Sequence, residues 1–489
     1  MMTRRRLAQS AAGLLGAGVV SVASSRAWTA AAAVDLAPLS RRVRGKVLAP
    51  TSDGYDQARR TFSFNPRTDA RPAAIVRCLD DADVARTIEF ARKARLELAV
   101  RGGGHDVLGA STCEGGVVID LAEMNAVALD KSGAMATVGP GARIGLVDNV
   151  LQDRRRGLAL GCNPTVGVSG LTLGGGFGWL VGKHGAACDN LLGAKLVTAE
   201  GRMLDVNASE HADLFWALRG GGGNFGVVTS LQYATRELDA VTGGFIAYPG
   251  GLLPEFLRFY RDYMAEAPDE LAVEVVAMTF DQPVVIAIVC WSGDPAVGER
   301  VLAPLRAFGP PLVSGLAVRP YAQAMTPTPE VAGAFQQHMR QPDGPRDAPG
   351  GYWLGGSLDV LSDAAIATIA ERLALARGGG AFGLGHYLHG EVCRIDPAAT
   401  PLLRPKGSVV YHFDASWGSA AQASERMAWV DGSLAAMRPH SRPTYINYLS
   451  TDDEPAVKAS YGSNYARLLS VKRAIDPDNV FHRNRNVRP

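Results

Sequence analysis

Three glycine-dense loops, each next to a strand-like run, constrain this chain more than any other feature. The first is Arg101-Gly-Gly-Gly-His105, the second spans residues 161–178 and the third spans residues 219–226. Glycine adopts backbone conformations closed to other residues and lets main chain approach a ligand closely. Successive N–H groups in such turns bind anions. Neither the G-x-G-x-x-G motif nor the P-loop motif fits well. A long dinucleotide such as FAD, which lies against main chain at several places, explains three separate loops.

The pattern around these loops predicts an α+β fold. Short apolar runs predict strands at residues 71–76, 96–100, 117–121, 135–139, 194–198 and 227–233. Alternating runs predict an antiparallel sheet, with strands at residues 272–278, 284–291 and 408–413. Apolar spacing predicts helices at residues 80–95, 144–155, 209–218, 361–376, 419–436 and 461–474, the first capped by Asp80 or Asp81.

This layout predicts an interrupted domain. Residues 46–238 form the FAD-binding domain, and residues 239–440 form an inserted substrate-binding domain whose antiparallel sheet is covered by helices. Residues 441–489 return to the FAD-binding domain. We therefore expect the substrate to meet the cofactor between the two domains.

The first 33 residues are typical of an export signal. They contain an arginine pair within Arg4-Arg5-Arg6, a weakly apolar stretch over residues 7–22 and a small-residue run from Ala30 to Ala33. The arginine pair resembles a twin-arginine signal, which predicts a periplasmic or secreted protein. A disordered or membrane-tethered N-terminus is the alternative. We expect no stable membrane association once the signal is removed.

Charge and cysteine content exclude other classes of protein. The net charge of +2 becomes −2 without the first 33 residues, so we expect no nucleic-acid partner. Six cysteines are too few to form a disulfide framework in a chain of 489 residues. The chain also contains no C-x-x-C pair of the kind that binds zinc, so we expect no metal site. Each cysteine is predicted to be a small buried apolar residue.

Four motifs in order resemble berberine-bridge-enzyme-like FAD-linked oxidoreductases, which have the vanillyl-alcohol-oxidase or PCMH-type FAD-binding fold. They are RGGGHDVLG, VGVSGLTLGGGFGWL with the following Cys188-Asp189-Asn190, LFWALRGGGGNFGVV, and the closing Tyr445-Ile-Asn-Tyr448 with DPDNVFHRNRNVRP. The resemblance extends from about Val47 to Pro489. It implies a two-lobed PCMH-type FAD-binding domain with an inserted substrate domain.

The resemblance implies that His105 is bonded covalently to the 8α-methyl group of FAD. Many relatives add a second bond from a cysteine directly before a proline. Here Asn163 precedes Pro164, and Cys162 lies one residue early. A one-residue shift in an extended loop turns a side chain to the other side. A single bond through His105 is therefore expected, with a second link through Cys162 as the unfavoured alternative.

The loops and the closing motif together predict the residues that contact FAD. They are Arg101, Gly102, Gly103, Gly104, His105, Asp106, Gly109, Asn163, Thr165, Val166, Gly167, Gly170, Leu171, Gly174, Gly175, Gly176, Gly178, Asn190, Gly226, Val227 and Asn484. Tyr445 and Tyr448 are the candidate catalytic residues, and a base role requires a lowered phenol pKa or concerted proton transfer. No acid occurs in Ala398-Ala-Thr-Pro401, where several relatives carry one.

The predicted function is that of an FAD-linked oxidase. It takes a hydride from an alcohol, sugar or amine carbon of a small molecule to flavin N5 and reduces O₂ to H₂O₂. The resemblance places Val166 on the oxygen-accessible side of the flavin, where a valine leaves room for dioxygen, which favours an oxidase. The alternatives are a flavin dehydrogenase with another electron acceptor and a flavin-binding protein without turnover.

Overall fold

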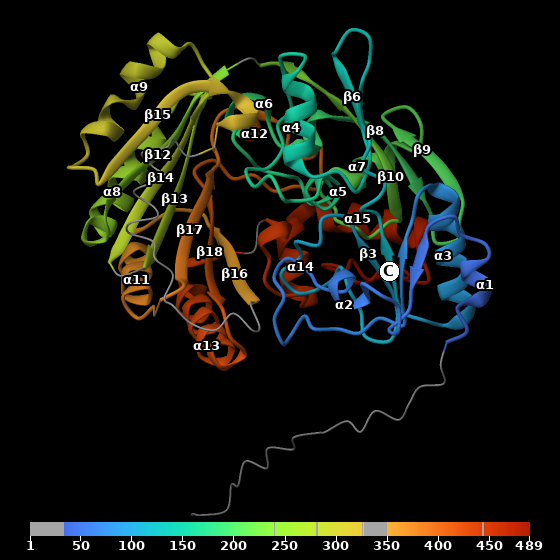
Figure 1. The fold of residues 1–489 in the computed structure, drawn as a ribbon. Helices are drawn as coiled ribbons and strands as arrows, with labels where there is room; N and C mark the ends of the chain where they lie inside the picture. Colours follow the sequence, from blue (N-terminus) through green and yellow to red (C-terminus); the bar gives the residue numbers. More distant parts are fainter. Residues whose placement is uncertain are drawn as a thin grey trace, which may run out of the picture. The chain divides into compact units, whose positions relative to one another are not determined.

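The first sheet is built from strands near the N-terminal end of the described chain (Figure 1). In this computed structural model its strands lie in the order β1 (Lys46–Leu48), β2 (Ala74–Arg77), β4 (Val117–Asp120) and β3 (Leu98–Arg101). Strands β2 and β3 run parallel to β4. Helix α3 (Asp81–Ala94) crosses between them, and its N-cap Asp80 accepts a hydrogen bond from the Asp83 N–H, which confirms the predicted cap.

The structure describes residues 34–238, 240–279, 282–324, 326, 350–376, 378–442 and 445–489. The predicted export signal, residues 1–33, lies outside the described residues. Residues 36–489 pack as one compact unit, so the division into domains at residues 239 and 441 remains a prediction.

The second sheet is antiparallel, and the third glycine loop leads directly into one of its strands. Its strands lie in the order β5 (Val127–Leu129), β6 (Met135–Val138), β10 (Val227–Ala234), β8 (Leu191–Val197) and β9 (Met203–Asn207). The helices around it are α4 (Ile144–Gln152), α5 (Val168–Leu173), α7 (Ala212–Leu218), α14 (Glu454–Tyr461) and α15 (Tyr465–Ile475). Leu468 and Tyr461 of the last two helices share one core with Phe225 and Leu231, so the C-terminal segment packs on this sheet.

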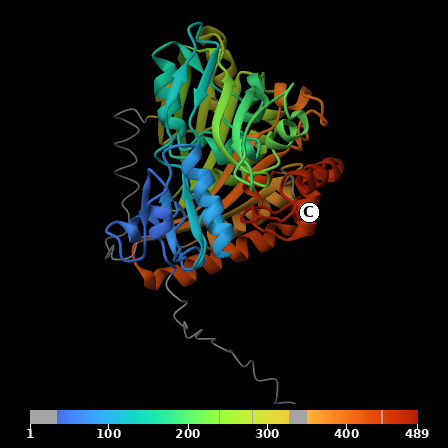
Figure 2. The same ribbon diagram turned by 90° about the vertical axis from the view of Figure 1, so that its right-hand side faces the viewer.

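The third sheet is a seven-stranded antiparallel sheet, as predicted. Its strands lie in the order β15 (Val313–Pro320), β12 (Ala240–Pro249), β14 (Pro283–Trp291), β13 (Leu271–Thr279), β17 (Gly380–Tyr387), β18 (Val409–Trp417) and β16 (Gly350–Leu358). One face is covered by α8 (Leu253–Ala265), α9 (Pro295–Ala307), α11 (Asp363–Ala374) and α13 (Ala420–Met437) (Figure 1 and Figure 2).

Alternation along these strands separates a core face from a cavity face. Val273 and Val275 of β13 and Phe413 of β18 pack under the helices. The residues between them, such as Glu274 and His412, point to the opposite side and line a cavity.

The remaining elements are short, and some helix boundaries differ from those predicted from sequence. They are α1 (Ala37–Ser40), α2 (Tyr55–Ala58), β7 (Arg156–Gly157) paired with β11 (Arg236–Glu237), α6 (Val181–His184), α12 (Glu391–Arg394) and 3₁₀ turns such as η1 (Ala187–Asn190) and η5 (Ile446–Tyr448). The helix predicted over residues 461–474 begins at Tyr465, because a 3₁₀ turn over Gly462–Asn464 interrupts the chain after α14. Helices α8 and α9 were missed, although apolar residues recur with helical spacing in both.

The α+β fold predicted from sequence is confirmed. No helix within the described part of the chain is both long and apolar enough to cross a bilayer.

A buried ion pair fixes the third glycine loop to the C-terminal segment. Lys472 Nζ lies 2.7 Å from Asp476 Oδ2 and donates to the carbonyl oxygens of Asn224 and Phe481 at 2.8 and 3.0 Å. Both charged side chains are fully buried. Asp476 also accepts hydrogen bonds from the N–H groups of Val480 and Phe481, so the pair holds two segments that are distant in sequence.

We expect Lys472→Met to lower the free energy of unfolding by about 3 kcal/mol, because it leaves a buried carboxylate without its partner. Urea unfolding followed by circular dichroism measures this change. The matched control is Lys195→Met, which breaks an exposed pair with Asp205 at 3.1 Å and should cost less than about 1 kcal/mol. Equal losses in the two variants would contradict the role given to burial.

Candidate functional site

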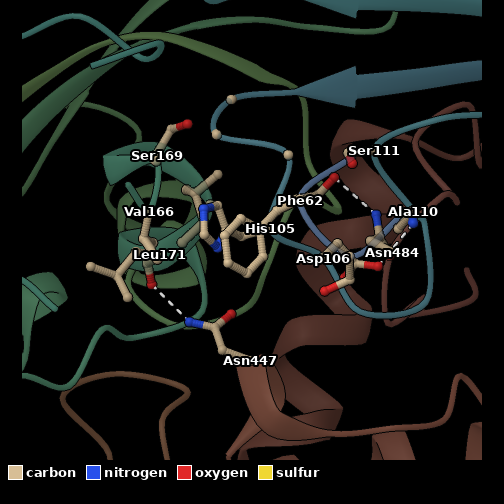
Figure 3. Close-up of a pocket in the computed structure, with 18 of the residues that line it drawn as sticks. Phe62, His105, Asp106, Ala110, Ser111, Val166, Ser169, Leu171, Asn447 and Asn484 are labelled. Carbon is tan, nitrogen blue, oxygen red and sulfur yellow. Dashed lines mark hydrogen bonds between the residues drawn. The ribbon is translucent and has the colours of Figure 1, made fainter. Parts of the chain in front are cut away.

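A cavity of about 890 Å³ lies where the three glycine loops meet the third sheet and the C-terminal segment (Figure 3). This volume falls within the range of small-molecule and cofactor sites. Most of the sequence-predicted residues line it: Gly102, Gly103, Gly104, His105, Asp106, Asn163, Val166, Gly167, Gly170, Leu171, Gly226, Val227, Tyr445, Tyr448 and Asn484.

The remaining predicted residues are not among those that line the cavity: Arg101, Gly109, Thr165, Gly174, Gly175, Gly176, Gly178 and Asn190. The buried Arg101 guanidinium donates to the carbonyl oxygens of Ala58 and Ser111. The Asn190 amide donates to the carbonyl oxygens of His184 and Ala186, at 2.9 and 3.0 Å. These two side chains stabilise the loops through hydrogen bonds to the backbone. The spacing of residues in the sequence does not distinguish such a side chain from one that contacts a ligand.

Gly174, Gly175, Gly176 and Gly178 lie outside the lining and belong to the second loop. Gly175 and Gly176 have φ values of 113° and 85°, a region that favours glycine. A Cβ atom at Gly178 would lie 2.7 Å from the carbonyl carbon of Leu160, and one at Gly174 would overlap the Asn447 amide. The fold of the loop by itself therefore requires glycine at these four positions.

The first and second glycine loops touch backbone to backbone. A Cβ atom at Gly103 would lie 2.6 Å from the Cα of Gly167, and one at Gly167 would lie 2.6 Å from the Cα of Gly103. Real Cβ atoms do not come this close to other heavy atoms. The mutual contact therefore requires glycine at both positions, and it sets the distance between His105 and the second loop.

The His105 ring is held from both sides. It stacks on Phe62 with ring centroids 3.9 Å apart and planes inclined by 17°, and its Nε2 lies 3.1 Å from Thr165 Oγ1. The Thr165 hydroxyl donates its only proton to Asn163 Oδ1 at 2.8 Å, so its oxygen accepts from the His105 Nε2–H. This chain of contacts assigns the proton to Nε2 and leaves the lone pair on Nδ1.

Burial keeps the same imidazole neutral. Desolvation lowers the pKa of His105 to about 4. The ring is consequently uncharged near neutral pH, which is the state in which a ring nitrogen is nucleophilic.

The cavity wall also carries polar atoms with no hydrogen-bond partner in the described structure. They are Ser111 Oγ, Asn484 Oδ1, Arg483 Nε and His412 Nδ1. Buried polar groups are normally satisfied, so unpaired donors and acceptors on residues of the wall leave room for a polar ligand. With the glycine-lined wall, these residues fit a cofactor with phosphates, ribityl hydroxyls and a heterocyclic ring, such as FAD.

The two tyrosines of the closing motif lie in the cavity but differ in their contacts. The Tyr445 hydroxyl accepts hydrogen bonds from the N–H groups of Gly176 and Phe177, both at 3.2 Å, and its ring stacks on Phe177. Tyr448 instead packs its ring against Trp353 and His412 of the third sheet. Tyr445 thus anchors the second loop, and Tyr448 is the phenol that packs against the third sheet.

Neither phenol has the lowered pKa that an ordinary base role requires. Burial raises the pKa of Tyr445 to about 12 and raises that of Tyr448 well above its usual value. A role for Tyr448 in proton transfer is therefore restricted to a step in which the proton and hydride move together.

The third sheet contributes titratable side chains that sequence analysis did not single out. Glu274, His412 and Asp414 point into the cavity from β13 and β18, beside Trp353 of β16. Burial raises the pKa of Glu274 and of Asp414 to about 7 and lowers that of His412 to about 4. No motif marks these residues, and only the alternation of each strand together with the covered face could have identified them.

The histidines of the segment 386–389 have different surroundings. His386 lines the cavity, and burial lowers its pKa to about 3. The buried His389 lies 3.1 Å from the Tyr387 carbonyl oxygen and 3.2 Å from that of Pro268. The His389 ring therefore stabilises the fold through contacts of both its nitrogens with backbone carbonyl oxygens.

We expect Gly103→Ala to destabilise the protein by about 1–3 kcal/mol, the usual cost of forcing a methyl group into filled space. The matched control is Gly251→Ala, which lies outside the cavity lining and where an added Cβ meets no protein atom within 4 Å. This variant should be about as stable as wild type. Thermal unfolding measures both, and a stable Gly103→Ala protein would contradict the proposed contact.

Comparison with known proteins places the site in a family. Residues 72–207 match the family model described as FAD binding domain, and residues 444–488 match that described as berberine and berberine like. The chain is 32% identical to (R)-6-hydroxynicotine oxidase of Paenarthrobacter nicotinovorans over 92% of this chain and 98% of the relative.

Solved structures agree with the sequence comparison. 6-Hydroxy-D-nicotine oxidase from Arthrobacter nicotinovorans superposes with a TM-score of 0.81 at 30% identity, covering 93% of this chain and 99% of that chain. A chitooligosaccharide oxidase superposes with a TM-score of 0.75 at 25% identity, covering 92% and 98%. The fold, the glycine-lined cavity and these similarities show that the chain belongs to the berberine-bridge-enzyme-like FAD-dependent oxidoreductases.

Proposed function

We propose that this FAD-dependent oxidoreductase is an oxidase of small cationic amines. When bound, FAD supplies the hydride acceptor at N5 and passes the electrons to O₂, giving H₂O₂. The observation that carries the proposal is that one cavity joins the glycine loops to a wall of the third sheet whose described charged residues are the acids Glu274 and Asp414. Alcohol and sugar carbons are the alternative substrates.

The glycine loops supply the groups that would hold the cofactor. Gly102–Gly104, Gly167, Ser111 and Asn484 line the cavity. Arg483 and Arg485 add positive charge at this end, although Arg485 is paired with Asp106. A polyanionic dinucleotide is matched by such a set of donors.

His105 is the residue we propose as the covalent anchor. The contacts of Thr165 leave the lone pair of His105 on Nδ1, and the low pKa keeps it available at neutral pH. Asn163 stands where relatives carry a linking cysteine, and here its side chain orients Thr165 instead. Cys162 lies against Glu274 of the substrate domain, which supports a single link through His105.

Thr165→Val should slow covalent attachment without removing bound flavin. The variant lacks the hydroxyl that accepts the His105 Nε2–H, so the Nδ1 lone pair is no longer favoured. The fraction of flavin that stays with acid-precipitated polypeptide measures attachment. Thr165→Ser retains the hydroxyl and should behave as wild type, whereas His105→Ala should release all flavin. Retained colour in His105→Ala would contradict the anchor, and normal attachment in Thr165→Val would contradict only the role of Thr165.

The substrate wall favours a cation. Asp414 lies directly opposite Trp353 in the β16–β18 register, and Tyr448 packs against the same tryptophan. Carboxylates and aromatic faces both attract an ammonium group. A carboxyl with a pKa near 7 is also suited to take the proton that an ammonium must lose before its carbon gives up a hydride. The relatives named for nicotine oxidation act on an amine, which agrees with this preference.

A substrate panel of amines, alcohols and oligosaccharides with a peroxide readout tests the function. Amines should bleach the flavin, and air should restore its colour rapidly. Val166 lies in the cavity wall, where a small side chain leaves space for oxygen. Bleaching without rapid reoxidation would identify a dehydrogenase, and no bleaching by any compound would favour a binding protein.

The pH dependence tests Asp414. Its raised pKa means that the carboxyl is protonated below about pH 7 and ionised above it. We therefore expect kcat/KM for an amine to rise through about pH 7 in the wild type. Glu274 titrates over the same range, so Asp414→Asn should flatten this rise without abolishing it, and should lose at least about tenfold in kcat/KM at pH 8, the value of one hydrogen bond to a charged group. The exposed Asp452→Asn is the control, and an unchanged profile in Asp414→Asn would contradict the role.

A further inference from the structure

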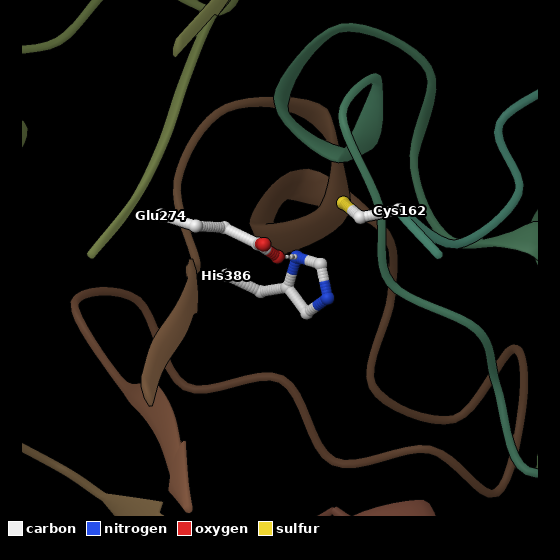
Figure 4. A group of neighbouring side chains, drawn as sticks. All are labelled: Cys162, Glu274 and His386. Carbon is white, nitrogen blue, oxygen red and sulfur yellow. Dashed lines mark ion pairs between the residues drawn. The ribbon is translucent and has the colours of Figure 1, made fainter. Parts of the chain in front are cut away.

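A cluster of three potential metal ligands lies on the substrate side of the cavity (Figure 4). Cys162 comes from the second glycine loop, Glu274 from β13 and His386 from β17. The Cys162 Sγ, one Glu274 carboxylate oxygen and one His386 ring nitrogen all lie within 4.8 Å of one another. Among the described residues this is the one group of three or more such side chains with this spacing.

The backbone of β17 is distorted where it presents His386. The pairing of β17 with β18 shifts register between Gly385 and Tyr387, so His386 is the extra residue of a β-bulge. Its φ of 40° lies in the left-handed region, which is uncommon outside glycine. Bulges re-aim a side chain, and strained backbone concentrates at functional sites.

Glu274 lies beside a glycine of the adjacent strand and has no basic lysine or arginine partner among the described ion pairs. A Cβ atom at Gly385 would lie 3.4 Å from Glu274 Oε1, so the carboxylate rests over a glycine of the adjacent strand. The ion pair found for Glu274 in the described structure is with His386 Nδ1, at 3.4 Å. No lysine or arginine neutralises this carboxylate there, which is unusual for a buried acid.

The spacing suits a tetrahedral ion. Zinc bonds of 2.0–2.3 Å to oxygen, nitrogen and sulfur place neighbouring ligand atoms about 3.3–3.6 Å apart. The Nδ1-to-Oε1 distance of 3.4 Å already lies in this range. One thiolate and one carboxylate would balance the charge of a divalent ion, and imidazole would complete three protein ligands.

We propose that Cys162, Glu274 and His386 bind a divalent transition-metal ion of the Zn²⁺ class. Binding releases the thiol proton to solvent, and no electron transfer is involved. The three side chains would occupy three coordination positions of the ion, and the fourth would face the cavity. An open fourth position can bind a heteroatom of the substrate. The sequence predicts no metal site, because metal-binding motifs are recognised by closely spaced ligands. The three ligands proposed here are each separated by more than 100 residues along the chain.

Metal counting tests the site independently of turnover. The full-length flavin-loaded protein is stripped with a chelator, dialysed against Zn²⁺, and its zinc is counted by atomic emission. We expect one ion per chain. Cys162→Ser, Glu274→Gln and His386→Asn should each weaken binding at least tenfold. Cys393→Ser, at another partly buried cysteine, should bind as wild type. Equal zinc binding in Cys162→Ser and wild type would overturn the site.

A second measurement needs only the wild type. Alkylation of Cys162 by iodoacetamide, followed by peptide mass spectrometry, should slow at least tenfold when Zn²⁺ is present, and Cys393 should be unaffected. An unchanged rate at Cys162, or a Cys162 peptide that carries flavin mass, would overturn the proposal. Both results are independent of whether amines are substrates.

Discussion

The contact between Gly103 and Gly167 is the constraint on which the site depends. Neither residue can carry a side chain, because each Cβ would fall inside the other backbone. The contact joins the loop after β3 to the loop before α5. It thereby brings His105 within reach of Thr165 and leaves an open cavity beside the two loops. A single methyl group at this point would move the histidine and the cavity wall together.

Desolvation in that cavity sets the charge state of its titratable groups. His105, His386 and His412 are held neutral, while the carboxyls of Glu274 and Asp414 have pKa values of about 7. The wall formed by the glycine loops is therefore suited to hold a dinucleotide, and the wall formed by the third sheet is suited to exchange protons or to bind a cation. The two walls come from segments that are far apart in the chain.

The loops and strands of the cofactor region could be predicted from sequence because local signals specify them. The Asp80 cap, the apolar runs at β4 and β6, and the glycine loops are each readable within a few residues. Helix α8 and strand β12 were not identified, although α8 has apolar residues at helical spacing, because the inserted segment has no motif and its strand order is only partly sequential. Asp414 and Glu274 were not identified for the same reason. Only the pairing of β13, β17, β18 and β16 brings them together.

The sequence by itself determined the class of cofactor and the family, because four ordered motifs, three of them glycine-rich, lie at fixed places along the chain. It could not decide where Cys162 points or which tyrosine faces the substrate. The tertiary structure turned Cys162 toward Glu274 and His386, anchored Tyr445 on the second loop and left Tyr448 beside Trp353. These outcomes depend on contacts between residues that are hundreds of positions apart, and such contacts exist only once the sheets have packed.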